Sequence, residues 1–304
     1  MRGKGLVLLP LLMTVVLTGC VHHSPFEEDY YFQAMGRDSE IVVTADTTRL
    51  KSAMPDLLTT GNGVMDDILD RSTRVSVSFY KDSYGGEEDY PADLSEFDYY
   101  GALEGNYGSF TINTALSWSS QFHKEKAGGV KYYTDDDHSI ELAVPESGLL
   151  LFASKDYVQA YLDTVEERLL RIDGETAKLM GESLFGLYVR SPKTMIDLGF
   201  ELPYSVIAKM SDALIYVNES EDGGYVLNAD ITMQSADLAG TLTQLLRQQV
   251  MGELRRQGIR PDFAALADSY RSEGSRVIVR GHALTEDQAA SLSGRITSIT
   301  GGVL

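Results

Sequence analysis

The sequence is short of cysteine and of basic residues. Its 304 residues contain one cysteine, Cys20, so no disulfide can form within the chain and no thiolate metal site can be built in the region that follows. Lysine and arginine number 26 against 45 aspartates and glutamates, which gives a formal net charge of −19. A surface this acidic repels phosphate backbones and anionic headgroups, which argues against nucleic-acid binding and against broad adsorption to membranes.

The motifs of common enzyme classes are also missing. The chain has no Gly-x-Ser-x-Gly elbow, no Gly-x-x-x-x-Gly-Lys loop, no His-Glu-x-x-His helix and no Gly-x-Gly-x-x-Gly turn. Of its five histidines, His123, His138 and His282 lie far enough from the N-terminus to serve as bases. We therefore predict no catalytic residue and no cofactor.

Long apolar runs are missing after the first 20 residues. Arg2 and Lys4 precede an uncharged segment over residues 6–17, and Leu17-Thr18-Gly19-Cys20 closes it. A positive start, a short apolar core and a small-residue cleavage site are typical of a secretory signal peptide, too short for a usual membrane span. We expect residues 1–19 to be removed between Gly19 and Cys20. The alternative is an ordinary signal with an incidental cysteine.

Leu17–Cys20 resembles the lipobox of bacterial lipoproteins. In that family the cysteine becomes the N-terminus and carries more than one acyl chain, palmitate included. The resemblance covers the first 20 residues and implies a covalent lipid on Cys20 and a place in the cell envelope, outside the cytoplasm. Val21 stands where an aspartate often retains lipoproteins in the inner membrane, which implies the outer membrane, on its periplasmic side or beyond, if the host has two.

The body shows the mixed periodicities of an α+β fold. Val75, Val77 and Phe79 alternate with polar residues, which predicts a half-buried strand. Residues 213–217 and 225–233 predict a hairpin, followed by a helix capped by Ser235. We expect a lipidated tether over residues 20–38, a first unit over 39–180 and a second over 181–304, each a mainly antiparallel sheet packed with helices.

The two units echo each other. Residues 99–116 align with residues 225–242 without a gap, at an offset of 126. The alignment matches Glu104 with Asp230 and Ser109 with Ser235. A divergent internal duplication explains the match; the alternative is that any strand followed by a capped helix shares these residue types.

Two helices of the body have a predicted inward face. Ser109 is a candidate N-cap, and helical spacing continues behind it to Phe122, with Trp118 expected as a core or rim residue. Pro261 suits the first turn of another helix, whose inward side chains would include Phe263.

A long polar stretch over residues 82–98 is the preferred interaction candidate. It interleaves acids with aromatics, and loops of this length are uncommon and often functional. Such a surface suits a cationic or sugar-like partner, although a solvated hairpin loop explains it too. Its candidate residues are Tyr84, Glu87, Glu88, Asp89, Tyr90 and Phe97.

The densest ligand-like cluster is Asp135-Asp136-Asp137-His138. Carboxylates suit Ca²⁺, and the imidazole would suit a transition metal. Adjacent residues on an extended chain point in different directions, however, so an acidic hairpin turn is the preferred interpretation.

Three hypotheses for the function follow. The first is a lipid-anchored, non-enzymatic envelope protein that binds or scaffolds an envelope protein, glycan or lipid. The second is a carrier of an apolar ligand in a pocket between sheet and helices, suggested by amphipathic helices at 158–172 and 238–254. The third is an envelope hydrolase that uses carboxylates or one of the three histidines.

Overall fold

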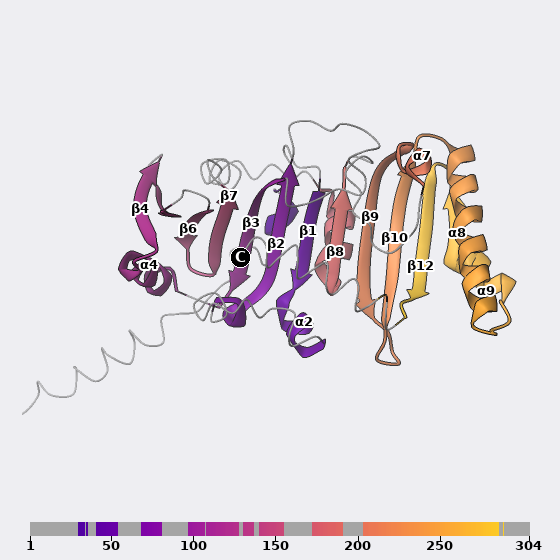
Figure 1. Cartoon of the computed structure of the whole chain (residues 1–304), viewed down its shortest axis with the longest axis horizontal. Helices are drawn as coiled ribbons and strands as arrows, with labels where there is room; N and C mark the ends of the chain where they lie inside the picture. The colour runs from indigo at the N-terminus through magenta and orange to yellow at the C-terminus, as the bar shows by residue number, and fades with distance from the viewer. Residues whose placement is uncertain are drawn as a thin grey trace, which may run out of the picture.

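The structure is a computed structural model that describes residues 30–33, 35, 41–53, 68–80, 97–106, 108–127, 130–136, 140–154, 172–190, 203–285 and 288. These residues form one twelve-stranded antiparallel sheet with helices against it, so the protein has an α+β fold, as predicted (Figure 1). Within them, no helix is both long enough and apolar enough to span a bilayer. Cys20 and the rest of residues 1–29 lie outside the described part.

Ten elements lie in the described residues before position 172. The 3-10 turn η1 (Tyr31–Gln33) and helices α2 (Thr47–Ala53) and α4 (Ser109–Trp118) accompany seven strands. The strands are β1 (Ile41–Asp46), β2 (Ser72–Tyr80), β3 (Asp98–Gly105), β4 (Phe122–Ala127), β5 (Val130–Asp135), β6 (Ile140–Glu146) and β7 (Leu149–Ser154).

The remaining elements follow residue 172. The helices are α6 (Gly174–Glu182), α7 (Tyr204–Ile207), α8 (Ala236–Arg256) and α9 (Phe263–Ser269). The strands are β8 (Phe185–Val189), β9 (Met210–Glu219), β10 (Tyr225–Met233), β11 (Tyr270–Glu273) and β12 (Arg276–Ala283).

The strand order repeats outward from the centre of the sheet. One side runs β1, β2, β3, β7, β6 and the other runs β8, β9, β10, β12, β11, with β5 and β4 extending the first side. The helix after the third strand, α4 or α8, lies at the corresponding end of the sheet in each half (Figure 1). The halves are thus related by an approximate two-fold axis at the β1–β8 pair. This arrangement agrees with the alignment of residues 99–116 on 225–242, while a shared ancestry of the halves stays a prediction.

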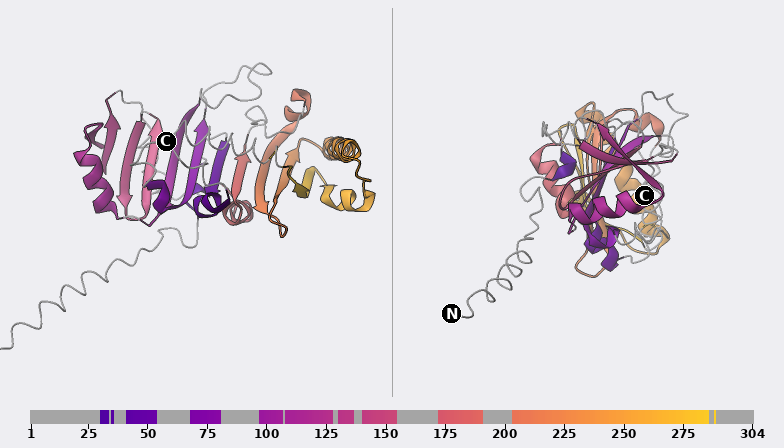
Figure 2. Two further views of the ribbon diagram at one scale, coloured as in Figure 1. Left: turned by 60° about the horizontal axis from the view of Figure 1, so that its bottom comes forward. Right: turned by 90° about the vertical axis from the view of Figure 1, so that its left-hand side faces the viewer.

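The sheet continues across the predicted boundary between residues 180 and 181. β1 and β8 pair antiparallel from Ile41 opposite Val189 to Ala45 opposite Phe185. The two predicted units therefore share one sheet, which is strongly twisted when seen end-on (Figure 2). Their division into separate units stays a prediction.

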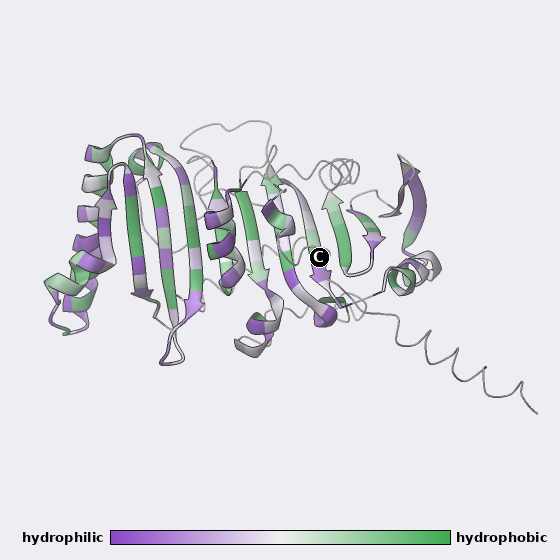
Figure 3. Ribbon diagram, turned by 180° about the vertical axis from the view of Figure 1, so that it is seen from behind, coloured by the Kyte–Doolittle hydropathy of each residue, from purple (hydrophilic) through white to green (hydrophobic). Residues whose placement is uncertain are grey.

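Alternate residues of the strands build one core on each face of the sheet. On the α8 face, Leu103 of β3 and Ala229 of β10 join a cluster with side chains of α2, α4, α8 and α9. On the opposite face, called here the α6 face, Tyr100 and Ala102 of β3 pack with side chains of η1 and α6. Figure 3 shows the resulting mixture of hydrophobic and hydrophilic positions along the strands.

The chain segment at the end of the predicted tether is part of the α6-face core. Tyr31, Phe32 and Met35 are 0–1% exposed. The Arg74 guanidinium lies 5.2 Å from the centre of the Tyr30 ring, and the backbone N–H of Ile172 donates to the carbonyl of Gln33 at 3.3 Å. Residues 30–33 and Met35 are therefore attached to the folded body.

The local predictions are partly confirmed. Ser235 caps α8 by accepting from the Leu238 N–H at 3.3 Å, as predicted. Thr285 and Gln288, whose spacing in the sequence is that of a capping box, exchange hydrogen bonds in both directions. The helix expected to continue to Phe122 ends at Trp118 instead, and residues 122–127 form strand β4. The prediction that Phe263 points inward is wrong, because it is 65% exposed and Leu266 makes the core contact of α9.

Candidate functional site

The residues predicted in the long acidic stretch are only partly described. Tyr84, Glu87, Glu88, Asp89 and Tyr90 lie outside the described residues. Phe97 is described, and it is 7% exposed within the core of the α8 face. In this structure Phe97 is therefore a packing residue that anchors the start of β3.

The acidic cluster at 135–138 is also described in part, because Asp137 and His138 lie outside the described residues. Asp135 accepts the Ile140 N–H at 3.2 Å, and Asp136 contacts Nε2 of His123. Among the described residues, no group of three or more side chains is placed to hold a metal ion. These two aspartates instead make the local contacts of a turn and a β4–β5 pair.

His282, another predicted candidate base, lies against Tyr270. Its Nδ1 is 2.6 Å from the Tyr270 hydroxyl, and burial lowers the pKa of the imidazole below its usual value. Burial also raises the pKa of the Tyr270 hydroxyl. Both groups are therefore held in their neutral forms near pH 7, which suits a structural hydrogen bond between β11 and β12.

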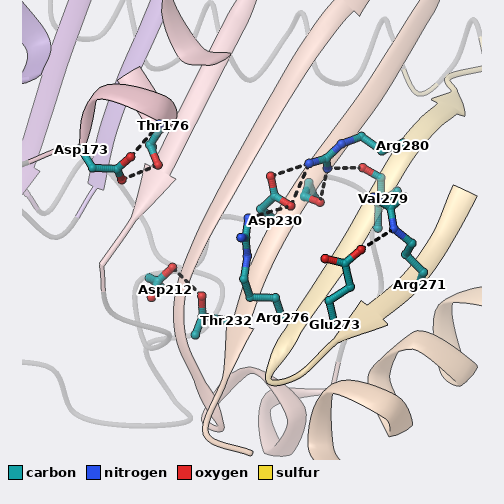
Figure 4. Close-up of polar contacts among 11 residues, drawn as sticks. Asp173, Thr176, Asp212, Asp230, Thr232, Arg271, Glu273, Arg276, Val279 and Arg280 are labelled. Carbon is teal, nitrogen blue, oxygen red and sulfur yellow. Dashed lines mark hydrogen bonds and ion pairs between the residues drawn. The ribbon is translucent and has the colours of Figure 1, made fainter. Parts of the chain in front are cut away.

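A charged cluster lies on the α6 face of the second half (Figure 4). Nη2 of Arg280 donates to both carboxylate oxygens of Asp230 on β10, at 2.9 and 2.8 Å. Nη2 of Arg276 lies 3.5 Å from Oδ1 of Asp230. Asp212 accepts from the Thr232 hydroxyl at 3.0 Å. Asp230, Asp212 and Arg276 also line a hollow of about 240 Å³ that reaches the start of α6.

The charged side chains of this cluster make hydrogen bonds with other groups of the protein. Nη1 of Arg280 donates to the Ala229 and Val279 carbonyls, so the guanidinium ties β10 to β12. At the start of α6, burial raises the pKa of Asp173, but hydrogen bonds from Thr176 and from nearby backbone N–H groups outweigh burial and leave the pKa below its usual value. We interpret the cluster as structural.

A larger hollow lies between α4 and the outer strands of the first half. Its volume is about 740 Å³, and we call it the α4 groove. Helix α4 contributes Ser109, Phe110, Asn113, Thr114, Ser117 and Trp118. The sheet contributes Lys124 of β4, Lys131 and Tyr133 of β5, and Val144 and Pro145 of β6.

Two exposed aromatic rings mark this groove. Phe110 is 83% exposed and Trp118 is 84% exposed. Both lie on one side of α4 with Thr114, at positions i, i+4 and i+8, while Ile112 and Leu116 are buried against the sheet. The expectation of a core position for Trp118 is therefore wrong, because its indole is presented to the surroundings where it lines the groove.

The base of the groove is held by hydrogen bonds. The Tyr133 hydroxyl donates to the Asn113 carbonyl at 3.1 Å and lies 3.1 Å from Oγ of Ser117. The Asn113 amide donates to the Ser109 carbonyl at 2.9 Å. These bonds fix α4 against β5, so the two rings stand on a rigid support.

The charge of the groove is opposite to that of the chain. Among the described residues, its lining includes Lys124 and Lys131 and no acidic side chain. Lys126 lies directly opposite Lys131 in the β4–β5 ladder, on the same face of the sheet. Strand β4 is mostly hydrophilic and is the outermost strand at the far right of Figure 3.

Sequence reasoning missed this site. The predicted helical spacing ends at Phe122 and no element is predicted between Phe122 and Val130, so the sequence assigns no face to Lys124 and Lys126 of β4. One signal was present: Ser109–Trp118 contains no charged residue, and Phe110 and Trp118 do not share the spacing of Ile112 and Leu116. A helix with two apolar directions predicts a second contact surface.

Comparison with known proteins finds relatives in structure alone. No family profile and no curated protein sequence matches the chain. Crystal form I of TP0453 superposes with a TM-score of 0.57 at 14% identity, over 87% of this chain and 96% of that one. Crystal form III of the same protein gives 0.54 at 12% identity, over 86% and 97%. The likeness establishes a shared α+β fold over nearly the whole of both chains.

Proposed function

We propose that this chain is a lipid-anchored binding protein of the bacterial cell envelope with a non-enzymatic role, and that the α4 groove holds its ligand. The lipid on Cys20 would provide the membrane attachment. The observation that carries the binding role is the pair of rings of Phe110 and Trp118, 83% and 84% exposed beside a hollow of about 740 Å³. Aromatic side chains presented around a concave surface are typical of binding sites.

The lining of the groove suits binding better than catalysis. Its described residues offer hydroxyl, amide and ammonium groups, and none of them is a carboxylate or an imidazole. General acid–base chemistry most often depends on those two groups. A rigid support under two exposed rings is the arrangement expected where a ligand is held without being changed.

The anchoring part of the proposal is tested by Cys20→Ala. We expect the variant to lose metabolic labelling by a fatty-acid probe and to leave the membrane fraction, because lipid on the cysteine supplies the attachment. A Cys20→Ala protein that is still labelled and membrane-bound would contradict it. A Val21→Ala variant, which keeps the cysteine, is the matched control.

The binding part is tested through the tryptophan. The chain contains one Trp, so 5-fluorotryptophan labelling gives one ¹⁹F resonance, at Trp118. Detergent-solubilised full-length protein is titrated with unlabelled protein, glycan and lipid fractions of the envelope. We expect one fraction to shift the resonance, with the shift lost in Phe110→Ser and kept in Phe263→Ser, which removes a comparably exposed ring from α9. A Trp118 resonance that shifts with none of the fractions would contradict the binding role.

A further inference from the structure

We infer that the α4 groove recognises an acidic oligosaccharide, with sugar rings stacked on Phe110 and Trp118 and acidic groups held by Lys124 and Lys131. This inference rests on the proposed binding role and names its ligand class. Three features of the groove carry it: the spacing of the rings, the polarity of the lining between them, and the sign of its charge.

The two rings are spaced for an extended ligand. Phe110 and Trp118 are eight residues apart on α4, which places them two turns, or about 12 Å, apart along the helix axis. Each is more than four-fifths exposed, so a flat face of each ring is accessible. A chain of several sugar units can span that distance and lay an apolar ring face on each platform.

The lining between the rings favours a polar ligand. Ser109, Asn113, Thr114 and Ser117 place hydroxyl and amide groups along the groove. The Thr114 and Ser117 hydroxyls donate to carbonyls of their own helix, so their oxygens can still accept from a ligand. A carrier of an apolar molecule needs mostly apolar walls that enclose it. Aromatic platforms alternating with hydroxyls and amides match the alternating apolar faces and hydroxyl edges of a sugar chain.

The lysines select for negative charge. Lys124 and Lys131 line the groove, and Lys126 faces Lys131 across the ladder, an arrangement that like-charge repulsion disfavours. Lysines on an edge strand also block strand-to-strand aggregation, which accounts for Lys124 and Lys126 on β4. It does not account for Lys131, because β5 is paired with β4 on one side and with β6 on the other. A negatively charged ligand accounts for all three.

An acidic peptide is the competing ligand class, and the geometry argues against it. An extended peptide would gain most by adding to the edge of β4, where backbone groups are available for a new ladder. The rings of Phe110 and Trp118 stand on α4, over the face of the sheet, and would not contact a peptide paired in the plane of the sheet.

The charge of the groove is tested without any ligand. In full-length protein, iodide and caesium ions quench the fluorescence of Trp118, the one Trp of the chain. Each quenching constant is divided by that of N-acetyltryptophanamide, because iodide quenches free indole more efficiently than caesium does. Despite the net charge of −19, we expect the normalised iodide constant to exceed the normalised caesium constant, and Lys124→Gln/Lys131→Gln to lower their ratio at least twofold. Lys178→Gln/Lys209→Gln, which removes the same charge elsewhere, should leave the ratio unchanged. A normalised ratio at or below one in the wild type would overturn the inference.

The ligand class is tested by calorimetry with four probes. These are a hexamer of galacturonic acid, a sulfated hexasaccharide, the neutral maltohexaose and hexaglutamate. We expect at least one acidic hexasaccharide to bind tenfold more tightly than maltohexaose and hexaglutamate, with about tenfold loss in Trp118→Ala and in Lys124→Gln/Lys131→Gln and no loss in Phe263→Ser.

The other results overturn the inference. Equal or tighter binding of hexaglutamate makes the ligand a peptide, equal binding of maltohexaose removes the role of the lysines, and no binding of either acidic hexasaccharide rejects the ligand class. A Trp118 resonance that still shifts with an envelope fraction would then keep the binding role while the sugar is rejected, so the two proposals fail separately.

Discussion

Glu104 and Asp230 occupy matching positions in the two halves of the sheet, and they are held in different ways. Both lie in the third strand of their half, on the α6 face, with exposures of 7% and 8%. Asp230 has two hydrogen bonds from Arg280 at 2.8 and 2.9 Å. Within the described part of the chain, Oε2 of Glu104 has no hydrogen-bond partner.

The difference lies in what the nearby arginine contacts. Arg74 stands opposite Glu104 in the β2–β3 ladder, but its guanidinium donates to Oγ1 of Thr44 and to the Gly181 carbonyl, and it lies over the Tyr30 ring. Burial therefore raises the pKa of Glu104 to about 7, although Arg74 acts to lower it. One half keeps a buried acid as an ion pair, and the other keeps a buried acid that is largely protonated below pH 7.

This comparison shows two ways of keeping a carboxyl group buried at equivalent positions of the sheet. Burying an unpaired carboxylate is costly, and either an arginine or a proton removes the cost. In the first half the Arg74 guanidinium contacts the ring of Tyr30 and the Gly181 carbonyl instead of the carboxyl of Glu104. The carboxyl of Glu104 therefore keeps its proton to a higher pH. The following predictions break or sharpen this contrast.

Arg280→Met should give the largest effect. It leaves Asp230 buried with the more distant Arg276 as the one cation beside it among the described residues, so we expect the free energy of unfolding to fall by about 3–4 kcal/mol. Urea denaturation at pH 7 measures it. The control is Arg271→Met, which breaks an exposed pair with Glu273 and should cost less than about 1 kcal/mol. Equal effects of the two changes would refute the role given to Arg280.

Glu104→Gln should show a difference that grows with pH. In the folded protein the carboxyl titrates at about 7, against an ordinary value of 4.5, so the stability that it contributes is complete below pH 4.5 and is lost as the pH rises through 7. We expect Glu104→Gln to be more stable than the wild type by about 2–3 kcal/mol at pH 8 and nearly equal to it at pH 4. Denaturation at both pH values tests this, and a constant difference would contradict a raised pKa.

Gly101→Ala should destabilise by about 2 kcal/mol. A Cβ at Gly101 would lie 2.1 Å from Cζ of Phe152, its partner on β7, so the ring must move. The aligned residue of the second half is Leu227, opposite His282, which leaves that half free of this constraint. The control is Gly240→Ala in α8, where a Cβ meets nothing within 4 Å and helix propensity favours alanine by about 1 kcal/mol. Thermal unfolding should therefore show shifts of opposite sign.

Ser235→Ala should lower the free energy of unfolding by less than the changes above. The loss should still be larger than that caused by its control, Ser109→Ala. Ser235 accepts the Leu238 N–H, whereas Gly108 is the N-cap of α4 and Ser109 is the first helical residue. We expect a loss of about 1 kcal/mol at Ser235 and a few tenths at Ser109. Equal losses would indicate that the two helix starts are equivalent after all.

Much of the fold could be predicted from the sequence because local signals agreed with the final structure. The alternation at Val75, Val77 and Phe79 indicated β2, and the turn at 222–224 indicated the β9–β10 hairpin. The offset of 126 between the halves indicated the matched strands β3 and β10. Merging both halves into one sheet could not be predicted, because it depends on the β1–β8 pair, whose strands are far apart in sequence.

The candidate site was harder to predict because its residues come from different elements. The spacing of Phe110 and Trp118 differs from that of Ile112 and Leu116, but this difference alone does not tell a second contact surface from a core position. Lys124 lines the groove because it lies on β4, a strand that begins at Phe122, where the helical spacing of the sequence ends. Sequence reasoning placed its interaction site in residues 82–98 instead, and the function of that stretch stays a prediction.

The docking of residues 30–33 and Met35 sets the working distance of the protein. If Cys20 carries the lipid, ten residue steps separate the membrane surface from Tyr30, and a fully extended chain of that length reaches about 35 Å. The body is then confined to a thin layer next to the bilayer, and it cannot search the depth of the envelope. Such confinement raises the local concentration of the groove for ligands that are themselves held near the membrane.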